Sequence, residues 1–106
     1  MPTGLLGQAA LTAVTNTAVY TVPTNTFTVF SVSVLNRGTA AVTVRMALAA
    51  TSTPTNAEWI EYDVPVDANG VLERTGLMMN AGKILVVYTS GSSVSVSAYG
   101  IETSTT

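Results

Sequence analysis

Two carboxylates on one predicted strand are the residues of this chain that come nearest to a catalytic arrangement. Glu61 and Asp63 alternate along the segment 59–66, which would place their backbones about 6.5–7 Å apart on a strand. Inverting glycosidases hold their two carboxyl groups at a comparable separation, and Trp59 could stack a sugar beside them. The neighbouring sequence supplies neither the walls of a cleft nor a reason for a raised carboxyl pKa. We therefore interpret the pair as the solvated face of a strand and expect no enzyme.

Other catalytic and metal chemistries are limited by what the chain lacks. It contains no histidine and no cysteine, which excludes a Ser-His-Asp triad, a thiolate nucleophile, a disulfide and a His- or Cys-ligated metal. Asp67, Asn69 and Gly70 are similar to the start of a calcium loop, but Met78 occupies the twelfth position, where an EF-hand needs a bidentate Glu. We expect a turn at this point, and neither a metal nor a cofactor.

The charge balance restricts the partners. Charged residues make up 9% of the chain, against about 25% in an average soluble protein, and the net charge is −2. One lysine and three arginines do not form the basic surface that nucleic acid requires. The longest apolar runs, 46–50 and 84–88, are far shorter than the roughly 20 residues of a membrane-spanning helix. No signal segment is recognisable, so we expect synthesis in a cytoplasm and neither nucleic acid nor a membrane as partner.

Aromatic residues are the candidates for ligand or protein contacts. Trp59, Tyr62, Tyr88 and Tyr99 could form a binding platform. Trp59 falls on the polar side of its predicted strand, which is typical of a contact surface because Trp is enriched at interface centres. The alternative is that both sides of this strand are covered and that Trp59 belongs to the core.

The start of the chain and one arginine complete the candidate interface. Residues 1–7 lack strand patterning but contain Leu5 and Leu6, which need cover, so we expect an extended N-terminal arm that reaches a neighbouring molecule. Arg45 is predicted to point outward from its strand, where it could pair with an acid of a neighbouring subunit. The candidate interface residues are thus Leu5, Leu6, Trp59 and Arg45.

Composition and period-two alternation predict an all-β fold. The chain has 18 Thr, 9 Ser and 15 Val, residues that suit a pleated, half-buried surface. A single domain over 1–106 is expected, with one helical turn at Ala57-Glu58 and a frayed tail over 103–106. The predicted strands cover residues 8–14, 18–22, 27–35, 41–49, 59–66, 71–79, 83–89 and 94–101.

The turns suggest how these strands pair. Asn36-Arg37-Gly38 should join the strands 27–35 and 41–49 as a hairpin, and Asp67 to Gly70 should join 59–66 and 71–79 in the same way. About eight short strands in one domain predict a small antiparallel β-sandwich that is jelly-roll-like. Because charges are so few, we expect much of the surface to be covered by copies of this chain or by a larger assembly. A soluble monomer with a Thr-rich coat is the alternative.

An ordered series of segments resembles a known family. The segments are TAVTNTAVYTVP (12–23), NRGTAAVTVRMALA (36–49), STPTNAEWIEYDV (52–64), ANGVLERTG (68–76) and VSAYGIE (96–102). Through them the chain resembles, from about Gly4 to Glu102, the small β-sandwich virion structural proteins of tailed bacteriophages, especially those of cyanophages. Members of this family are capsid decoration or cement proteins, head appendages, and tail or fibre components. The resemblance carries over no catalytic motif.

This resemblance implies a capsid decoration protein on the outer capsid surface of the virion. Its partners would be the major capsid protein and other copies of the same chain, as a homotrimer, and it would clamp neighbouring capsid subunits against internal DNA pressure. Such a protein is made in the host cytoplasm and released by lysis. The alternative function is a tail- or head-fibre module that binds a host receptor or a host-surface glycan.

Overall fold

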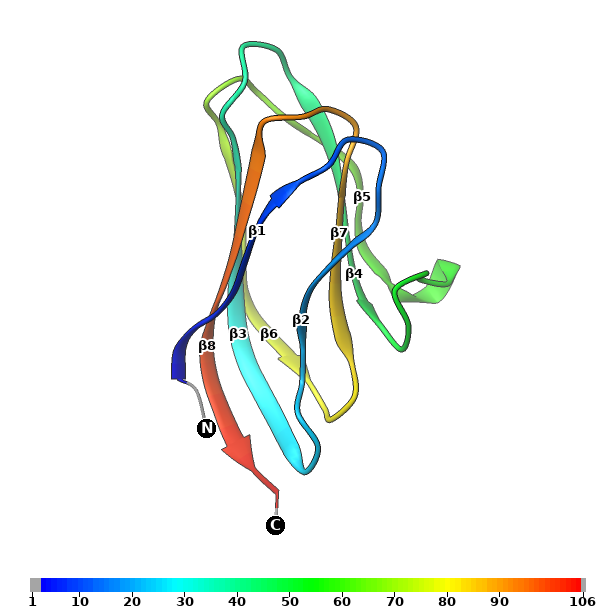
Figure 1. Cartoon of the computed structure of the whole chain (residues 1–106), viewed down its shortest axis with the longest axis vertical. Coiled ribbons are helices and arrows are strands. Elements are labelled where there is room, and N and C mark those ends of the chain that lie inside the picture. The colour runs from blue at the N-terminus through cyan, green and yellow to red at the C-terminus, as the bar shows by residue number, and fades with distance from the viewer. Residues whose placement is uncertain (1–2, 106) are drawn as a thin grey trace.

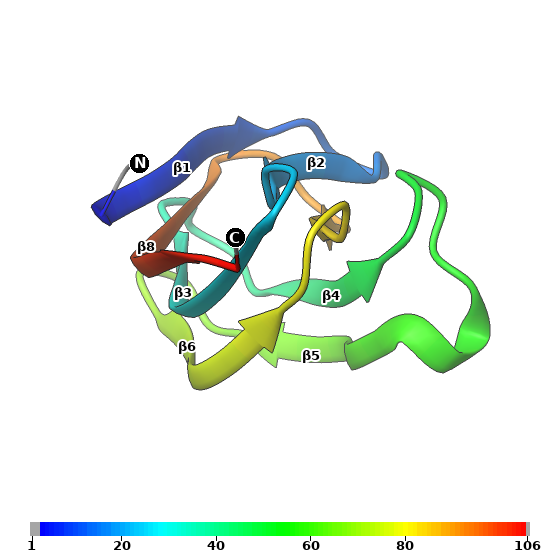
Figure 2. The ribbon, with the colours of Figure 1, turned by 90° about the horizontal axis from the view of Figure 1, so that it is seen from below.

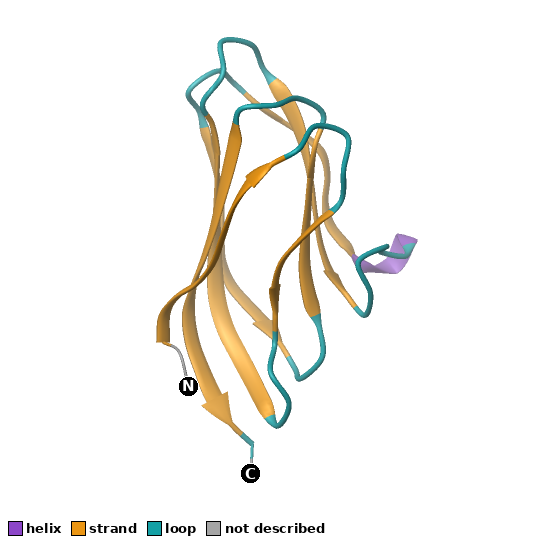
Figure 3. Cartoon of the chain, viewed as in Figure 1, coloured by secondary structure: helices purple, strands orange, loops and turns teal. Residues whose placement is uncertain are grey.

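The computed structural model describes residues 3–105, and in this range strands dominate, with one turn of 3-10 helix (Figure 3). No helical segment among these residues is long and apolar enough to cross a membrane. The all-β class is confirmed, and the predicted helical turn is present with one additional residue. The elements are β1 (Thr3–Leu11), β2 (Thr17–Thr21), β3 (Thr26–Asn36), β4 (Val42–Ala49), η1 (Asn56–Glu58), β5 (Trp59–Val66), β6 (Val71–Met79), β7 (Ile84–Thr89) and β8 (Val94–Ser104).

The strands form two four-stranded antiparallel sheets that pack face to face (Figures 1 and 2). Sheet A has the strand order β1-β8-β3-β6, and sheet B has the order β2-β7-β4-β5. The pairs β4–β5, β3–β6, β2–β7 and β1–β8 are those of one long hairpin that turns between β4 and β5. Rolling up this hairpin adds the pairs β3–β8 and β4–β7, which makes the sandwich a jelly roll, as the fold prediction proposed.

Both hairpins expected from the turn sequences are wrong, because these turns cross between the sheets. β3 and β6 belong to sheet A, whereas β4 and β5 belong to sheet B. The buried side chain of Asn36 accounts for the crossing after β3. Its Nδ2 donates to the carbonyls of Ala40 and Val66 at 2.9 and 3.1 Å, and its Oδ1 accepts from the N–H of Gly38 at 2.9 Å. One side chain therefore ties the end of β3 to the end of β5 across the sandwich.

The N-terminal segment is a strand, so the predicted arm over residues 1–7 is wrong for Thr3–Gly7. These residues pair with β8, and the register shifts at a bulge between Leu5 and Gly7. Gly4 also has a positive φ of 105°. The bulge and the glycines interrupt the period-two alternation, which explains why the sequence pattern shows no strand here. Residues 1–2 of the predicted arm lie outside the described residues.

The C-terminal end is more regular than predicted. Thr103 and Ser104 of the expected frayed tail extend β8 along β3, with Ser104 opposite Thr26. Thr106 lies outside the described residues. The predicted bounds of the strands over 59–66 and 71–79 match β5 and β6 at both ends.

The core lies between the sheets and consists mainly of valine. Phe30, Val32 and Val34 lie on one side of β3 and are buried, and they meet Val44 and Met46 of β4. Branched side chains at alternate positions fill the space between two pleated surfaces without needing a helix. The residues between these core positions point away from the core and form the two outer faces of the sandwich.

One polar cluster is buried in this core, near the end of the sandwich where the termini lie. The Tyr20 hydroxyl on β2 donates to Oε2 of Glu102 on β8 and lies 2.8 Å from Oγ1 of Thr28 on β3. Glu102 Oε1 is buried without a hydrogen-bond partner among the described residues. Burial, followed by the hydrogen bond with Glu102, raises the pKa of Tyr20 to about 12. The cluster fastens β2 of sheet B to two strands of sheet A.

Candidate functional site

The two carboxylates of the predicted strand do not act together. Glu61 Oε2 accepts from Arg74 Nη1 at 2.8 Å, and Arg74 belongs to β6 of sheet A. Asp63 instead pairs with Arg45 on β4 of sheet B, through contacts of 2.6 and 3.3 Å. Asp63 has a positive φ of 53°, and the β4–β5 register is irregular beside it, so simple alternation along β5 fails. The pair is thus divided between two ion pairs and offers no glycosidase geometry.

The outer face of sheet B, here called the sheet B face, is centred on Arg45. Its guanidinium carbon lies 4.2 Å from the ring centre of Tyr62 and 4.5 Å from that of Tyr88. The hydrogen bond to Asp63 raises the pKa of Arg45, so the group stays charged. Cation–π contacts and a bidentate ion pair satisfy this guanidinium within the chain. Arg45 points outward, as predicted, but its partner is its own Asp63.

Trp59 covers the neighbouring part of the sheet B face. It packs with Ile84 against the buried side chains of Ala47, Ala49 and Val86, which form a small cluster separate from the main core. Trp59 is only partly buried, and Tyr62 of the same strand is 56% exposed, so β5 is not covered on both sides and Trp59 does not belong to the main core.

The aromatic residues do not form one platform. The Trp59 ring meets the Tyr62 ring edge to face, at 5.5 Å and 75°. Tyr99, the fourth candidate, lies on β8 of sheet A, on the other side of the sandwich. The platform predicted from the sequence is therefore divided between the two sheets, and its sheet B part presents rings at an angle to each other.

The outer face of sheet A, here called the sheet A face, carries large exposed apolar side chains. Ile101 of β8 lies opposite Val29 of β3, and Val29 lies opposite Met78 of β6. In the next row Leu5 of β1 lies opposite Tyr99. These five side chains are all exposed, and together they extend over all four strands. Sequence reasoning proposed Leu5 for an interface but missed the rest, although the outward-facing apolar residues of 27–35 were a signal.

The two leucines proposed for the interface point to opposite sides of β1. Leu5 is 55% exposed on the sheet A face, whereas Leu6 is partly buried and packs against the core. Leu6 therefore stabilises the sandwich itself, and Leu5 remains the interface candidate of the two.

Charge is almost absent from the sheet A face. Among the outward-facing residues of its four described strands, Glu73 is the one charged side chain, and it accepts from the Tyr99 hydroxyl at 3.3 Å. Burial, together with the charge of Glu73, raises the pKa of Tyr99, so this hydroxyl keeps its proton. The remaining outward positions carry Thr, Ser, Gln, Ala and apolar residues.

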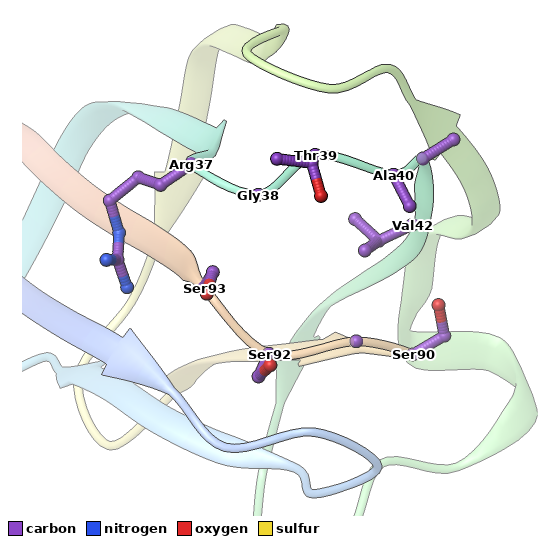
Figure 4. A pocket seen from close by; sticks show the side chains of 10 residues that line it. Arg37, Gly38, Thr39, Ala40, Val42, Ser90, Ser92 and Ser93 are labelled. Atoms are coloured by element: carbon purple, nitrogen blue, oxygen red, sulfur yellow. The ribbon is translucent and has the colours of Figure 1, made fainter.

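A pocket of about 540 Å³ lies at the end of the sandwich opposite the termini, between the β3–β4 and β7–β8 connections (Figure 4). Its lining is small and polar, with Ser90, Ser92, Ser93 and Thr39. Arg37 is its one charged residue, and Arg37 Nε already donates to Ser95 Oγ at 2.7 Å. The hydroxyl groups of this lining can both donate and accept hydrogen bonds.

The predicted turn at Asp67 to Gly70 is present. The N–H of Gly70 donates to the carbonyl of Asp67 at 2.8 Å, and Asn69 has a positive φ of 61°. Within the part of the chain that the structure describes, no three acidic residues gather in a group that could hold a metal ion.

Comparison with known proteins adds no relative to this picture. No protein-family model matches the chain, and no curated protein matches it. The described residues form an eight-stranded jelly-roll sandwich. On its sheet B face, Trp59 and Arg45 contact side chains of the same chain, whereas the apolar side chains of its sheet A face are exposed.

Proposed function

We propose that this chain is a structural protein of a tailed-bacteriophage virion, and specifically a capsid decoration (cement) protein. The observation that carries the proposal is the sheet A face, where six large apolar side chains are exposed and Glu73 is the one charged residue at the outward positions of the described strands. Val71 is the sixth, at the far end of β6. Soluble monomers rarely leave such a contiguous apolar surface open. A component of a large assembly has its surface covered in use, and the sequence resemblance to virion proteins points to the same role.

The proposed cementing mechanism needs a rigid protein that is present in many copies. A sandwich of two sheets is stiff, so it can hold neighbouring copies of the major capsid protein at a fixed separation on the outer capsid surface. Each contact can be modest, because many copies acting together produce high avidity. The resemblance implies self-association as a homotrimer. No catalytic group, metal or cofactor takes part in this mechanism.

The contact with the shell is assigned to the end of the molecule that carries both termini (Figure 1). The apolar rows of the sheet A face lie toward this end, because Ile101 is close to the end of β8 and Val29 is close to the start of β3. Leu5, from the segment first expected to be an arm, belongs to the same patch. The proposed attachment is therefore through a strand surface and not through a free arm.

The test is the copy number of this chain in purified virions, measured by quantitative mass spectrometry against the major capsid protein. A ratio near one is expected for a protein that covers the shell. A few to a few dozen copies per particle would contradict cementing and transfer the chain to a tail, fibre or vertex. Its absence from particles would overturn the virion proposal altogether.

A fibre module that binds a host-surface glycan is the second candidate function. The observation in its favour is Tyr62, which is 56% exposed beside Trp59 and Arg45 on the sheet B face. It ranks second because the two rings meet at 75° and do not offer one flat surface. A glycan array with the wild-type chain and Tyr62→Ala tests it, since binding that is lost in this variant would establish the glycan site.

A further inference from the structure

We propose that the sheet A face binds the sheet A face of a second copy of this chain, with Ile101, Met78 and Leu5 in the contact. The inference deepens the proposed function. It rests on that function only in its fifth argument, which assumes that the chain is made before it meets a capsid. It names the partner that covers this surface in free solution, before the shell takes the place of the second copy. It also replaces the trimer that the resemblance implies by a pair, because a surface that packs on its own copy closes at two molecules.

The first argument is the continuity of the apolar surface. Ile101 is 57% exposed, Met78 is 64% exposed and Leu5 is 55% exposed, and they lie on three different strands. Val29 fills the position between Ile101 and Met78, and Tyr99 lies opposite Leu5 in the adjacent row. Adjacent rows on four paired strands make one patch and not scattered residues. Such a patch is what distinguishes an interaction site from an ordinary surface.

The second argument is that this surface is already rigid. Gly100 lies on β8 between Tyr99 and Ile101, and a Cβ at this position would overlap the carbonyl oxygen of Val29 and the backbone of Phe30. β8 therefore approaches β3 more closely than any other residue at position 100 would allow. The backbones of both strands are held in place before a partner arrives, so no backbone ordering entropy is lost there on binding.

The third argument is the available area. Four strands spaced about 4.8 Å apart and roughly nine residues long give the face an area of about 19 × 30 Å, or ~570 Å². Two such faces bury about 1,100 Å², which reaches the ~1,000 Å² at which specific interfaces begin. The whole face, including its polar part, is needed to reach this area. We therefore expect a modest affinity and not an obligate dimer.

The fourth argument concerns the chemical match. A partner for this face must itself present a flat and nearly uncharged surface, because charged groups buried against methyl groups would lose hydration without gaining a partner. The chain has only ten charged residues in total, four basic and six acidic, and its sheet A face meets this requirement. Glu73, the one charged residue at the outward positions of the described strands, already accepts a hydrogen bond from the Tyr99 hydroxyl, which offsets part of the cost of covering it.

The fifth argument is the time of synthesis. A virion protein is made before it meets the shell, so its exposed apolar face must be covered in free solution. The partner present at that stage is another copy of the same chain. A membrane does not fit, because the outward positions of the four described strands carry no basic residue that would attract anionic lipid. Arg37 reaches the face only at Ser95, near the start of β8 and far from Ile101.

The first experiment is sedimentation velocity of the purified full chain between about 0.1 and 100 µM. The wild type should form a dimer, and Ile101→Glu should raise its dissociation constant by at least about 100-fold, because it buries an unpaired charge. Val14→Glu is the matched control, since Val14 is 68% exposed in the β1–β2 connection, away from the sheet A face. A monomer at the highest concentration, a trimer, or equal behaviour of the two variants would overturn the inference.

The second experiment needs no variant. Met78 should oxidise with hydrogen peroxide about 10-fold more slowly at concentrations where the dimer forms than in dilute solution, because the thioether becomes covered. Met79, which is 2% exposed, is the internal reference for unfolding. Equal oxidation rates of Met78 at both concentrations would refute the interface. Neither experiment involves particles, so a dimer without a virion location, or the reverse, separates this inference from the proposed function.

Discussion

The two outer faces of this sandwich deal with exposed side chains in opposite ways. On the sheet B face, Trp59 covers a small apolar cluster, and Arg45 is held by Tyr62, Tyr88 and Asp63. On the sheet A face, nothing in the described chain covers the patch centred on Ile101. Both faces come from strands of similar composition. The difference is that the sheet B face contains a tryptophan and an ion pair, whereas the outward positions of the described strands of sheet A contain neither.

This comparison shows where the chain stabilises itself and where it needs another molecule. A side chain that contacts its own fold contributes to the unfolding free energy of the monomer. A side chain that is covered only when a partner binds contributes to the free energy of association and has little effect on the free energy of unfolding. Substitutions on the two faces should therefore have separable effects, and three predictions test this from the largest expected effect to the smallest.

Replacing Trp59 should have the largest effect on stability. Trp59→Ala uncovers the cluster of Ala47, Ala49 and Val86, and we expect a loss of about 2–3 kcal/mol in the unfolding free energy, somewhat below the cost at a fully buried Trp. Ile101→Thr keeps a β-branched residue on the sheet A face and should change stability by less than about 0.5 kcal/mol. Urea unfolding at submicromolar protein concentration measures both.

Protein concentration sharpens this first prediction. At concentrations where the dimer forms, Ile101→Thr should lower the apparent stability relative to the wild type, because binding stabilises only the folded state. Trp59→Ala should cost the same at both concentrations. If Ile101→Thr were as costly as Trp59→Ala in dilute solution, the division between the two faces would be wrong.

The second prediction compares the two sides of β8. Ile101 points outward, but Glu102 points inward to the hydroxyl of Tyr20, whose pKa is raised from 10 to about 12. The folded state therefore holds this proton more tightly than the unfolded state. The associated stability is fully present below about pH 10 and is lost as the pH rises toward 12, by roughly 2–3 kcal/mol at most.

Tyr20→Phe tests this linkage. The variant should lose about 1–3 kcal/mol at neutral pH, because Glu102 loses its hydroxyl donor, and it should also lose most of the alkaline dependence. Tyr62→Phe on the sheet B face is the control and should keep the dependence of the wild type. Urea unfolding between pH 8 and pH 12 gives the result, and an unchanged alkaline slope in Tyr20→Phe would contradict the assignment.

The third prediction concerns two adjacent leucines of β1. Leu6 packs against the core, so Leu6→Ala should cost about 1–2 kcal/mol, while Leu5→Ala on the sheet A face should cost less than about 0.5 kcal/mol. Leu5→Ala should instead weaken the dimer. Thermal unfolding and sedimentation velocity together separate the two effects. Equal losses of stability would mean that β1 does not lie as the strand register places it.

Local sequence patterns determined much of this fold. Alternation along residues 27–35 predicted a strand and put Phe30, Val32 and Val34 on one side of it, and the structure shows that this side faces the core. The bounds of β5 and β6 followed from the turn residues on either side. These features depend on side chains within a few residues of each other, so the chain carries them without reference to distant partners. The lack of charge that makes the sheet A face unusual was also visible in the composition.

The tertiary structure alone decided how the strands combine. Both predicted hairpins fail because Asn36 bonds to a strand end thirty residues away, a contact that no turn sequence reveals. Pairing with β8 makes the expected arm a strand, and the bulge at Leu5 hides the alternation that would have predicted it. The irregular register near Asp63 turns this residue away from Glu61. Alternation assigns each residue to one of the two sides of a strand. Only the packing of the two sheets decides which side is buried. That is why Trp59 packs against a cluster of its own sheet, whereas Ile101 is exposed.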